Sequence, residues 1–198
     1  MARTSLNSAL RMLSGEIDGF VYRHQPDGSV TVAKKLSPRP DRPRHAAQVR
    51  ESERFRDAAA RCQILLQDPA IKAGYEQIMT RRSPMSRLRA VVIGDVLKPP
   101  DIRRLDLSRY QGGAGQTIRL YAQDNVAVAR LALVIYDLTA DRELEADEKP
   151  YPPERLRPVA EWSYTTQRLL PPGHLAEVRA SAWDLAGNKT DLVQPVTW

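Results

Sequence analysis

The hydrophobic period of this chain changes at a double proline, Lys98-Pro99-Pro100-Asp101, and this change is the strongest constraint on its fold. Before it, apolar residues recur every three or four positions, which is typical of helices. After it, apolar and polar residues alternate, which is typical of half-buried strands. Because proline disfavours helix in the residue before it, a helical region should end here. The sequence therefore predicts an α+β protein divided into residues 1–98 and 99–198.

Three helices are predicted in the first part. The first spans about residues 46–67, and its apolar face is formed by Phe55, Ala59, Cys62 and Leu66. Asp68-Pro69 can cap and open a second helix that ends near Thr80. Ser83-Pro84 repeats this pattern and predicts a third helix that ends before Pro99.

A hairpin and a basic connector are predicted before the helices. Two β-prone runs, residues 17–24 and 29–34, flank the turn residues Gln25-Pro26-Asp27-Gly28. An isolated hairpin is marginal in water, so this one should pack on a neighbour. Residues 36–44 follow, with three prolines and three arginines that favour an extended cationic segment. The candidate residues of this assembly or anion-binding arm are Phe20, Tyr22, Arg39, Arg42 and Arg44.

Alternating runs in the second part predict about six or seven strands within roughly 100 residues, the size of a β-sandwich. The runs are residues 102–107, 117–122, 126–138, a segment around Trp162 and Tyr164, 176–182 and 192–196. Residues 139–158 are acidic and then rich in proline, so they are predicted to form a surface excursion.

Three of these segments resemble a bacterial Ig-like domain: residues 115–128, 161–164 and 182–188, the last with the pattern Ala-x-Asp-x-x-Gly-Asn. The resemblance covers about half the chain and implies an immunoglobulin-like β-sandwich. Such domains act as spacers, adhesive modules or decorations on larger assemblies. Residues 13–22, the basic connector and residues 48–55 resemble the start of uncharacterised bacterial and phage-associated proteins, which implies no activity.

The sequence contains no recognisable catalytic motif, and we predict that the protein is not an enzyme and takes no cofactor, metal or small-molecule substrate. The segment from Gly112 to Thr117 lacks the lysine of a phosphate-binding loop and is predicted to be a turn. The acidic run at residues 141–147 has Ala146 where a helix-flanked calcium loop needs glycine. Asp124, Asp184 and Asp191 could gather at one end of the sandwich and hold calcium, but capping of turns also explains these aspartates and is the favoured interpretation.

The charge of the chain is uneven. Its formal net charge is +6, yet residues 1–98 hold 18 Lys and Arg against 10 Asp and Glu. Such a region can bind an anionic partner, or its arginines can form solvated helix faces. The acidic residues interspersed among the arginines favour the second interpretation, because they would repel phosphates.

We therefore expect a non-enzymatic structural protein that assembles into a homo-oligomer or a larger, phage-like particle through its N-terminal arm. The alternatives are a nucleic-acid-associated protein that uses the basic half, and an adhesive or glycan-binding module with Trp162 and Trp183 as candidate aromatics. No stretch approaches the roughly 18 apolar residues of a membrane span, and the first residues do not form a secretory signal. Together with a single cysteine, Cys62, these features predict a cytoplasmic location or a particle assembled there.

Overall fold

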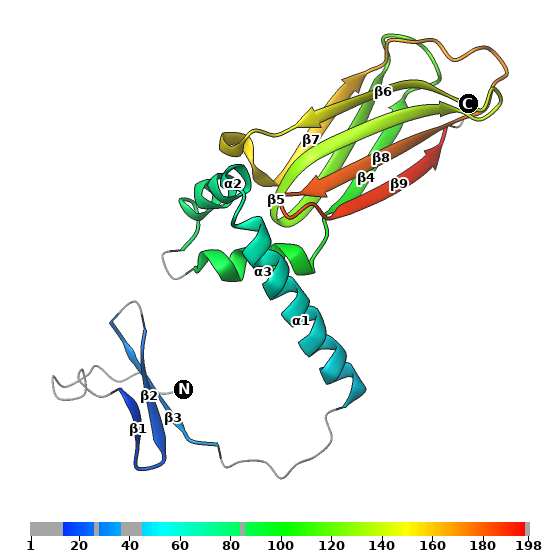
Figure 1. Cartoon of the computed structure of the whole chain (residues 1–198). Coiled ribbons are helices and arrows are strands. Elements are labelled where there is room, and N and C mark those ends of the chain that lie inside the picture. Colours follow the sequence, from blue (N-terminus) through cyan, green and yellow to red (C-terminus); the bar gives the residue numbers. More distant parts are fainter. Residues whose placement is uncertain (1–13, 26–27, 37–44, 84–85, 197–198) are drawn as a thin grey trace. The chain divides into compact units, whose positions relative to one another are not determined.

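A computed structural model describes residues 14–25, 28–36, 45–83 and 86–196. The chain has two compact units, Met1–Val49 and Arg50–Trp198, which we describe separately. The predicted α+β class is confirmed, because the structure contains three α-helices and antiparallel sheets (Figure 1). The units divide at residue 49, whereas the change of hydrophobic period lies at residue 98.

The first unit contains a three-stranded antiparallel sheet with the order β1-β2-β3. Its strands are β1 (Gly15–Ile17), β2 (Phe20–His24) and β3 (Val30–Lys34). The predicted hairpin is confirmed, since β2 pairs with β3 from Phe20↔Lys34 to His24↔Val30. Strand β1 was not predicted. It is joined to β2 by Asp18 and Gly19, whose φ angles of 49° and 76° suit the tight turn of a two-residue hairpin.

The second unit begins with the helices α1 (Ala46–Leu65, whose first turn lies before the unit boundary), α2 (Pro69–Met79) and α3 (Leu88–Leu97). Asp68 caps α2 as predicted, because its Oδ1 accepts hydrogen bonds from the backbone amides of Ala70 (2.8 Å) and Ile71 (3.3 Å). Helix α3 begins later than Ser83-Pro84 predicted, after Arg87, whose side chain makes no capping hydrogen bond.

Helix α1 is buried only over its second half. Ala58 and Cys62 are buried, whereas Phe55, which the apolar pattern placed inward, is 56% exposed. Every residue from Ala46 to Asp57 is exposed, and in Figure 1 this part of the helix projects away from α2 and α3. The prediction for Phe55 was therefore wrong, because the helix extends past the elements on which it packs.

The larger sheet has six strands, and β5 is its centre. The strands are β4 (Asp101–Arg109), β5 (Thr117–Asp137), β6 (Arg142–Pro150), β7 (Arg157–Thr165), β8 (Ala176–Asp184) and β9 (Lys189–Pro195). The first half of β5 pairs with β4 and β7. Its second half pairs with β6 and β8, and β9 lies beside β8. The two strands predicted at residues 117–122 and 126–138 are therefore one continuous strand.

A corner divides β5 into these halves, and the pairing with β7 shifts register there, between Gln123 and Val128. Asp124 shapes the corner, because its Oδ2 accepts hydrogen bonds from the amides of Val126 (2.6 Å) and Ala127 (2.8 Å). Apolar residues from both halves share one core with β4, β6, β7 and β8. The corner thus lets one strand contribute to both groups of strands around that core.

Strand β6 corrects the prediction of a surface excursion at residues 139–158. It pairs with β5 from Arg130↔Pro150 to Asp137↔Arg142, and Leu144 is only 6% exposed. The strand is mostly charged, so it lacks the apolar alternation used to predict strands. An edge strand needs a partner on one side only, and charged residues are common there because they discourage pairing with other chains.

A second core joins the helices to the corner of β5. It contains Cys62, Tyr75 and Val92 from the helices, packed against Val126 and Ala127. Gly74 lets α2 approach closely, because a Cβ atom at this position would lie 3.0 Å from a methyl group of Leu185. The helices therefore belong to the same compact unit as the sheet.

Candidate functional site

Three aspartates from distant parts of the second unit meet where the helices pack against the sheet. They are Asp95 in α3, Asp124 at the corner of β5 and Asp184 at the end of β8. Their residues are only 0%, 5% and 3% exposed, respectively. One carboxylate oxygen from each lies within 4.8 Å of the others. We call these residues the aspartate cluster.

The cluster differs by one member from the group considered in the sequence. Asp124 and Asp184 are brought together as that hypothesis required, but Asp191 is not part of the cluster. Asp191 instead forms an ion pair with Lys189 (2.8 Å) and accepts a hydrogen bond from Ser181 (2.5 Å). Asp95 takes its place. Its position could have been found, because it follows Val91 by four residues and so lies on the buried face of α3.

Asp95 links α3 to α2 and to the turn after β8. Its Oδ2 accepts hydrogen bonds from the hydroxyl of Tyr75 in α2 (2.5 Å) and from the amide of Ala186 after β8 (3.0 Å). Burial, reinforced by the nearby charge of Asp184, raises the pKa of Asp95 to about 8. Burial and the adjacent Asp95 also raise the pKa of the Tyr75 hydroxyl, which therefore remains a donor.

Asp184 holds the turn between β8 and β9. Its Oδ1 accepts a hydrogen bond from the amide of Asn188 (2.7 Å), and its Oδ2 accepts one from the Asn188 side chain (2.7 Å). The same side-chain amide also donates to the main-chain oxygen of Asp95 (2.9 Å). Turn capping by Asp184, predicted from the Gly-Asn pattern, is thus confirmed. Burial raises the pKa of Asp184 to about 6.

Two oxygens of the cluster have no hydrogen-bond partner within the described part of the chain. They are Oδ1 of Asp95 and Oδ1 of Asp124, both inaccessible to solvent. The Asp124 side chain lies within hydrogen-bonding reach of Asp95. Two ionised carboxylates can only accept, so contact between them requires a proton or a cation.

Arg61 is the basic residue that reaches this region, but it does not pair with the cluster. Its guanidinium donates to the main-chain oxygen of Ala186 (2.7 Å) and, at 3.5 Å, to the side-chain oxygen of Asn188. Among the described residues, none of the three aspartates takes part in an ion pair. No cationic side chain of the described residues is therefore bonded to the cluster.

The predicted arm residues are only partly within the structure. Phe20 is 43% exposed, and Tyr22, two residues further along β2, is half-buried. Arg39, Arg42 and Arg44 lie outside the described residues.

Several arginines of the helical region bind backbone oxygens within the second unit. Arg54 donates to Leu97 (3.3 Å), and Arg82 donates to Asn125 (2.9 Å). Arg81 bridges the main-chain oxygens of Leu156 and Glu154, each at 3.1 Å. These guanidinium groups join α1 to α3 and tie the end of α2 to β5 and to the segment before β7, so they are committed to contacts within the protein.

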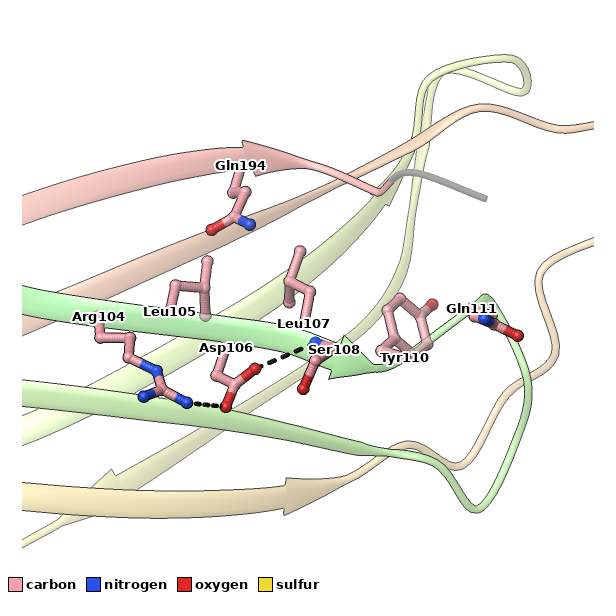
Figure 2. A pocket seen from close by; sticks show the side chains of 8 residues that line it. All are labelled: Arg104, Leu105, Asp106, Leu107, Ser108, Tyr110, Gln111 and Gln194. Atoms are coloured by element: carbon pink, nitrogen blue, oxygen red, sulfur yellow. Dashed lines mark hydrogen bonds and ion pairs between the residues drawn. The ribbon is translucent and has the colours of Figure 1, made fainter.

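A surface hollow of about 400 Å³ lies along β4 and reaches Gln194 of β9 (Figure 2). Within it, the carboxylate of Asp106 pairs with Arg104 and accepts a hydrogen bond from the amide of Ser108 (3.1 Å). Hydrogen bonds from Ser108 and Arg104 hold the pKa of Asp106 well below its usual range. The charged groups of the hollow, Arg104 and Asp106, thus pair with each other.

The two tryptophans considered for glycan binding have other contacts. Trp162 is 7% exposed and packs edge to face on Tyr164, with 5.6 Å between the ring centroids. The guanidinium of Arg130 stacks on Trp183, 3.9 Å from the ring centroid. Trp162 is a core residue, and one face of Trp183 is covered by Arg130.

No known family model matches the chain, and no curated protein is significantly similar to it. Within the described ranges, no helix has both the length and the apolar character needed to cross a membrane.

Proposed function

We propose that the chain is a non-enzymatic structural protein that assembles through its first unit into a homo-oligomer or a larger particle. The second unit, as an Ig-like β-sandwich, forms the body or a decoration of that assembly. One observation carries the proposal: the three-stranded sheet of the first unit has an apolar face but no buried residue among those described.

The pairing of the strands defines this apolar face. Ile17 lies opposite Phe20, and Tyr22 lies opposite Val32, so all four side chains point to the same side of the sheet, which also carries Lys34 on the other flank of Phe20. Ile17, Phe20 and Val32 are 38%, 43% and 50% exposed. A small sheet needs a covered hydrophobic face to be stable in water. A second copy of the chain supplies an identical surface, which a twofold-symmetric dimer buries against itself.

The strand arrangement of the second unit supports an Ig-like body. The sheet of the second unit has six strands, and β5 contributes one half to each of two groups. The first half of β5 forms a group of three with β4 and β7, and the second half forms a group of four with β6, β8 and β9. Both groups surround a shared core. Two antiparallel groups of this size are typical of the Ig-like fold. The buried free thiol of Cys62 is compatible with assembly in a reducing compartment such as the cytoplasm.

Light scattering coupled to size-exclusion chromatography tests the proposal on the full chain. The double variant Phe20→Lys, Val32→Glu places charges on the apolar face while leaving the net charge unchanged. The matched control Val21→Lys, Ala33→Glu makes the same change on the opposite face, where these two residues are paired. We expect the natural chain and the control to form the same defined oligomer and the Phe20/Val32 variant to be a monomer.

Other outcomes contradict the proposal in different ways. A natural chain that remains monomeric at high concentration rules out self-assembly. An oligomer that survives the Phe20/Val32 change forms through another surface. An oligomer that dissociates on nuclease treatment and at raised salt would instead support the nucleic-acid alternative.

A further inference from the structure

The buried carboxyl groups of the aspartate cluster require compensation, either by protons or by a cation. Asp95, Asp124 and Asp184 are at least nine-tenths buried, and ionised carboxylates are costly to bury unless paired. Their hydrogen bonds with Tyr75 and Asn188 satisfy part of this requirement. The fully buried Oδ1 atoms of Asp95 and Asp124 receive no hydrogen bond from another described residue, and the raised pKa of Asp95 lets a proton lie between these two side chains when no cation is bound.

One oxygen of Asp95 and one of Asp124 remain available as ligands. In both residues Oδ2 is already engaged, by Tyr75 and Ala186 on Asp95 and by two amides at the β5 corner on Asp124. Those bonds fix the orientation of each carboxylate and leave its other oxygen available. Fixed ligand orientation is what outer hydrogen bonds provide in metal sites.

The chemistry of the cluster selects a hard cation. Its members are carboxylates, without the histidine or cysteine ligands that favour zinc. Ca²⁺ binds oxygens at about 2.3–2.6 Å, so two oxygens on opposite sides of the ion are about 4.6–5.2 Å apart. One oxygen from each residue of the cluster lies within 4.8 Å of the others, so none is too far from the rest for a single ion to contact all three. Mg²⁺ retains several waters when it binds, which suits this buried position less well than Ca²⁺ does.

We propose that Asp95, Asp124 and Asp184 bind one Ca²⁺ ion that fastens α3 to the corner of β5 and the end of β8. The ion takes the place of the proton that Asp95 otherwise holds, and it attracts all three carboxylates. It therefore stabilises the contact between helices and sheet within the second unit. This inference is independent of whether the first unit drives assembly.

Calorimetric titration of the full chain, after removal of metals with a chelator, tests the site directly. We expect one Ca²⁺ per chain and, at saturation, an increase in melting temperature of about 5 °C or more. Mg²⁺ should bind more weakly. Elemental mass spectrometry before and after chelation shows that the protein used for the titration has been freed of metal. If the metal-free natural chain does not bind Ca²⁺, the proposal is overturned.

Asp124→Asn is the informative variant because it removes charge and one ligand without changing side-chain size. Its remaining oxygen can still accept from Val126 and Ala127, and its new NH₂ group can donate to Oδ1 of Asp95. We expect Ca²⁺ affinity to fall at least about tenfold, since charge count sets affinity in such sites. The metal-free variant should melt above the metal-free natural chain, because an NH₂ donor replaces a contact between two carboxyl groups that exists only while one of them holds a proton.

Asp191→Asn is the matched control. It removes the same charge from the aspartate that the sequence grouped with this site but that lies outside the cluster, and it should bind Ca²⁺ like the natural chain. Asp95→Asn provides a second cluster variant if Asp124→Asn does not fold, and it should also lose Ca²⁺ binding. Unchanged affinity in a folded cluster variant would place the ion elsewhere and overturn the proposal.

Discussion

The hydroxyl of Tyr75 in α2 donates a 2.5 Å hydrogen bond to Oδ2 of Asp95 in α3, and both residues are fully buried. This bond joins two helices through the centre of the core that they share with the β5 corner. Because neither group contacts water, the bond cannot be replaced by hydration when one partner is removed.

Tyr75→Phe should therefore lower the free energy of unfolding by about 1–3 kcal/mol, the range for a buried polar group that loses its partner. Urea unfolding followed by fluorescence measures this change. Tyr136→Phe is the control, because its hydroxyl bonds to Asp141 at an exposed position (2.8 Å). If the two substitutions lower the free energy of unfolding equally, burial of the Tyr75 hydrogen bond does not increase its contribution to stability.

Arg81→Lys should weaken the attachment of α2 to the segment before β7. The guanidinium of Arg81 bridges two backbone oxygens, of Leu156 and Glu154, with separate nitrogens. Lysine carries a single charged nitrogen and cannot reproduce this fork. We expect a loss of about 1 kcal/mol in unfolding free energy, measured by urea unfolding. Arg89→Lys, on an exposed position of α3, should have a smaller effect, and a similar loss there would contradict the bridging role.

Cys62 should react with thiol reagents only when α1 separates from the second core. Its side chain is fully buried between α1 and the other helices. We expect labelling roughly 100-fold or more slower in the native than in the unfolded protein, because the reaction requires local opening. The control is the double variant Cys62→Ala, Ala60→Cys, which moves the thiol to an exposed position of α1. Fast labelling of native Cys62 would show that this core is not closed in solution.

Asp137 should make the second unit sensitive to acid. Burial alone would raise the pKa of its carboxyl, but His174 (2.8 Å) and the amides of Ala140 and Thr139 stabilise the charged form and lower the pKa below its ordinary value. A carboxyl with a lowered folded-state pKa stabilises the fold above its unfolded pKa of about 4, and this contribution is lost as pH falls through the folded value. Asp137→Asn should be less stable than the natural chain at pH 7.

The difference between the two proteins should shrink as pH falls below about 4, where the natural carboxyl becomes protonated as well. Urea unfolding midpoints between neutral and acidic pH measure it. A difference that stays constant over that range would assign the effect of the substitution to geometry instead of charge.

Local features of the sequence were sufficient to predict much of the secondary structure. The hairpin around residues 25–28, the cap of α2 at Asp68 and most strands after residue 98 follow from turn residues and from hydrophobic period. These signals act between residues a few positions apart, so they do not depend on the rest of the fold. Charged β6 escaped prediction because its place comes from backbone pairing with β5, which carries no side-chain pattern.

Only the tertiary structure decided which aspartates meet. The sequence showed that Asp184 and Asp191 flank a turn, and the β8–β9 register then places Asp191 opposite Ser181, away from the cluster. Asp95 enters the cluster because α3 packs on the corner of β5, a contact between elements far apart in the sequence. Hydrophobic period indicates which face of an element is buried, but long-range packing determines which other residues share that buried space.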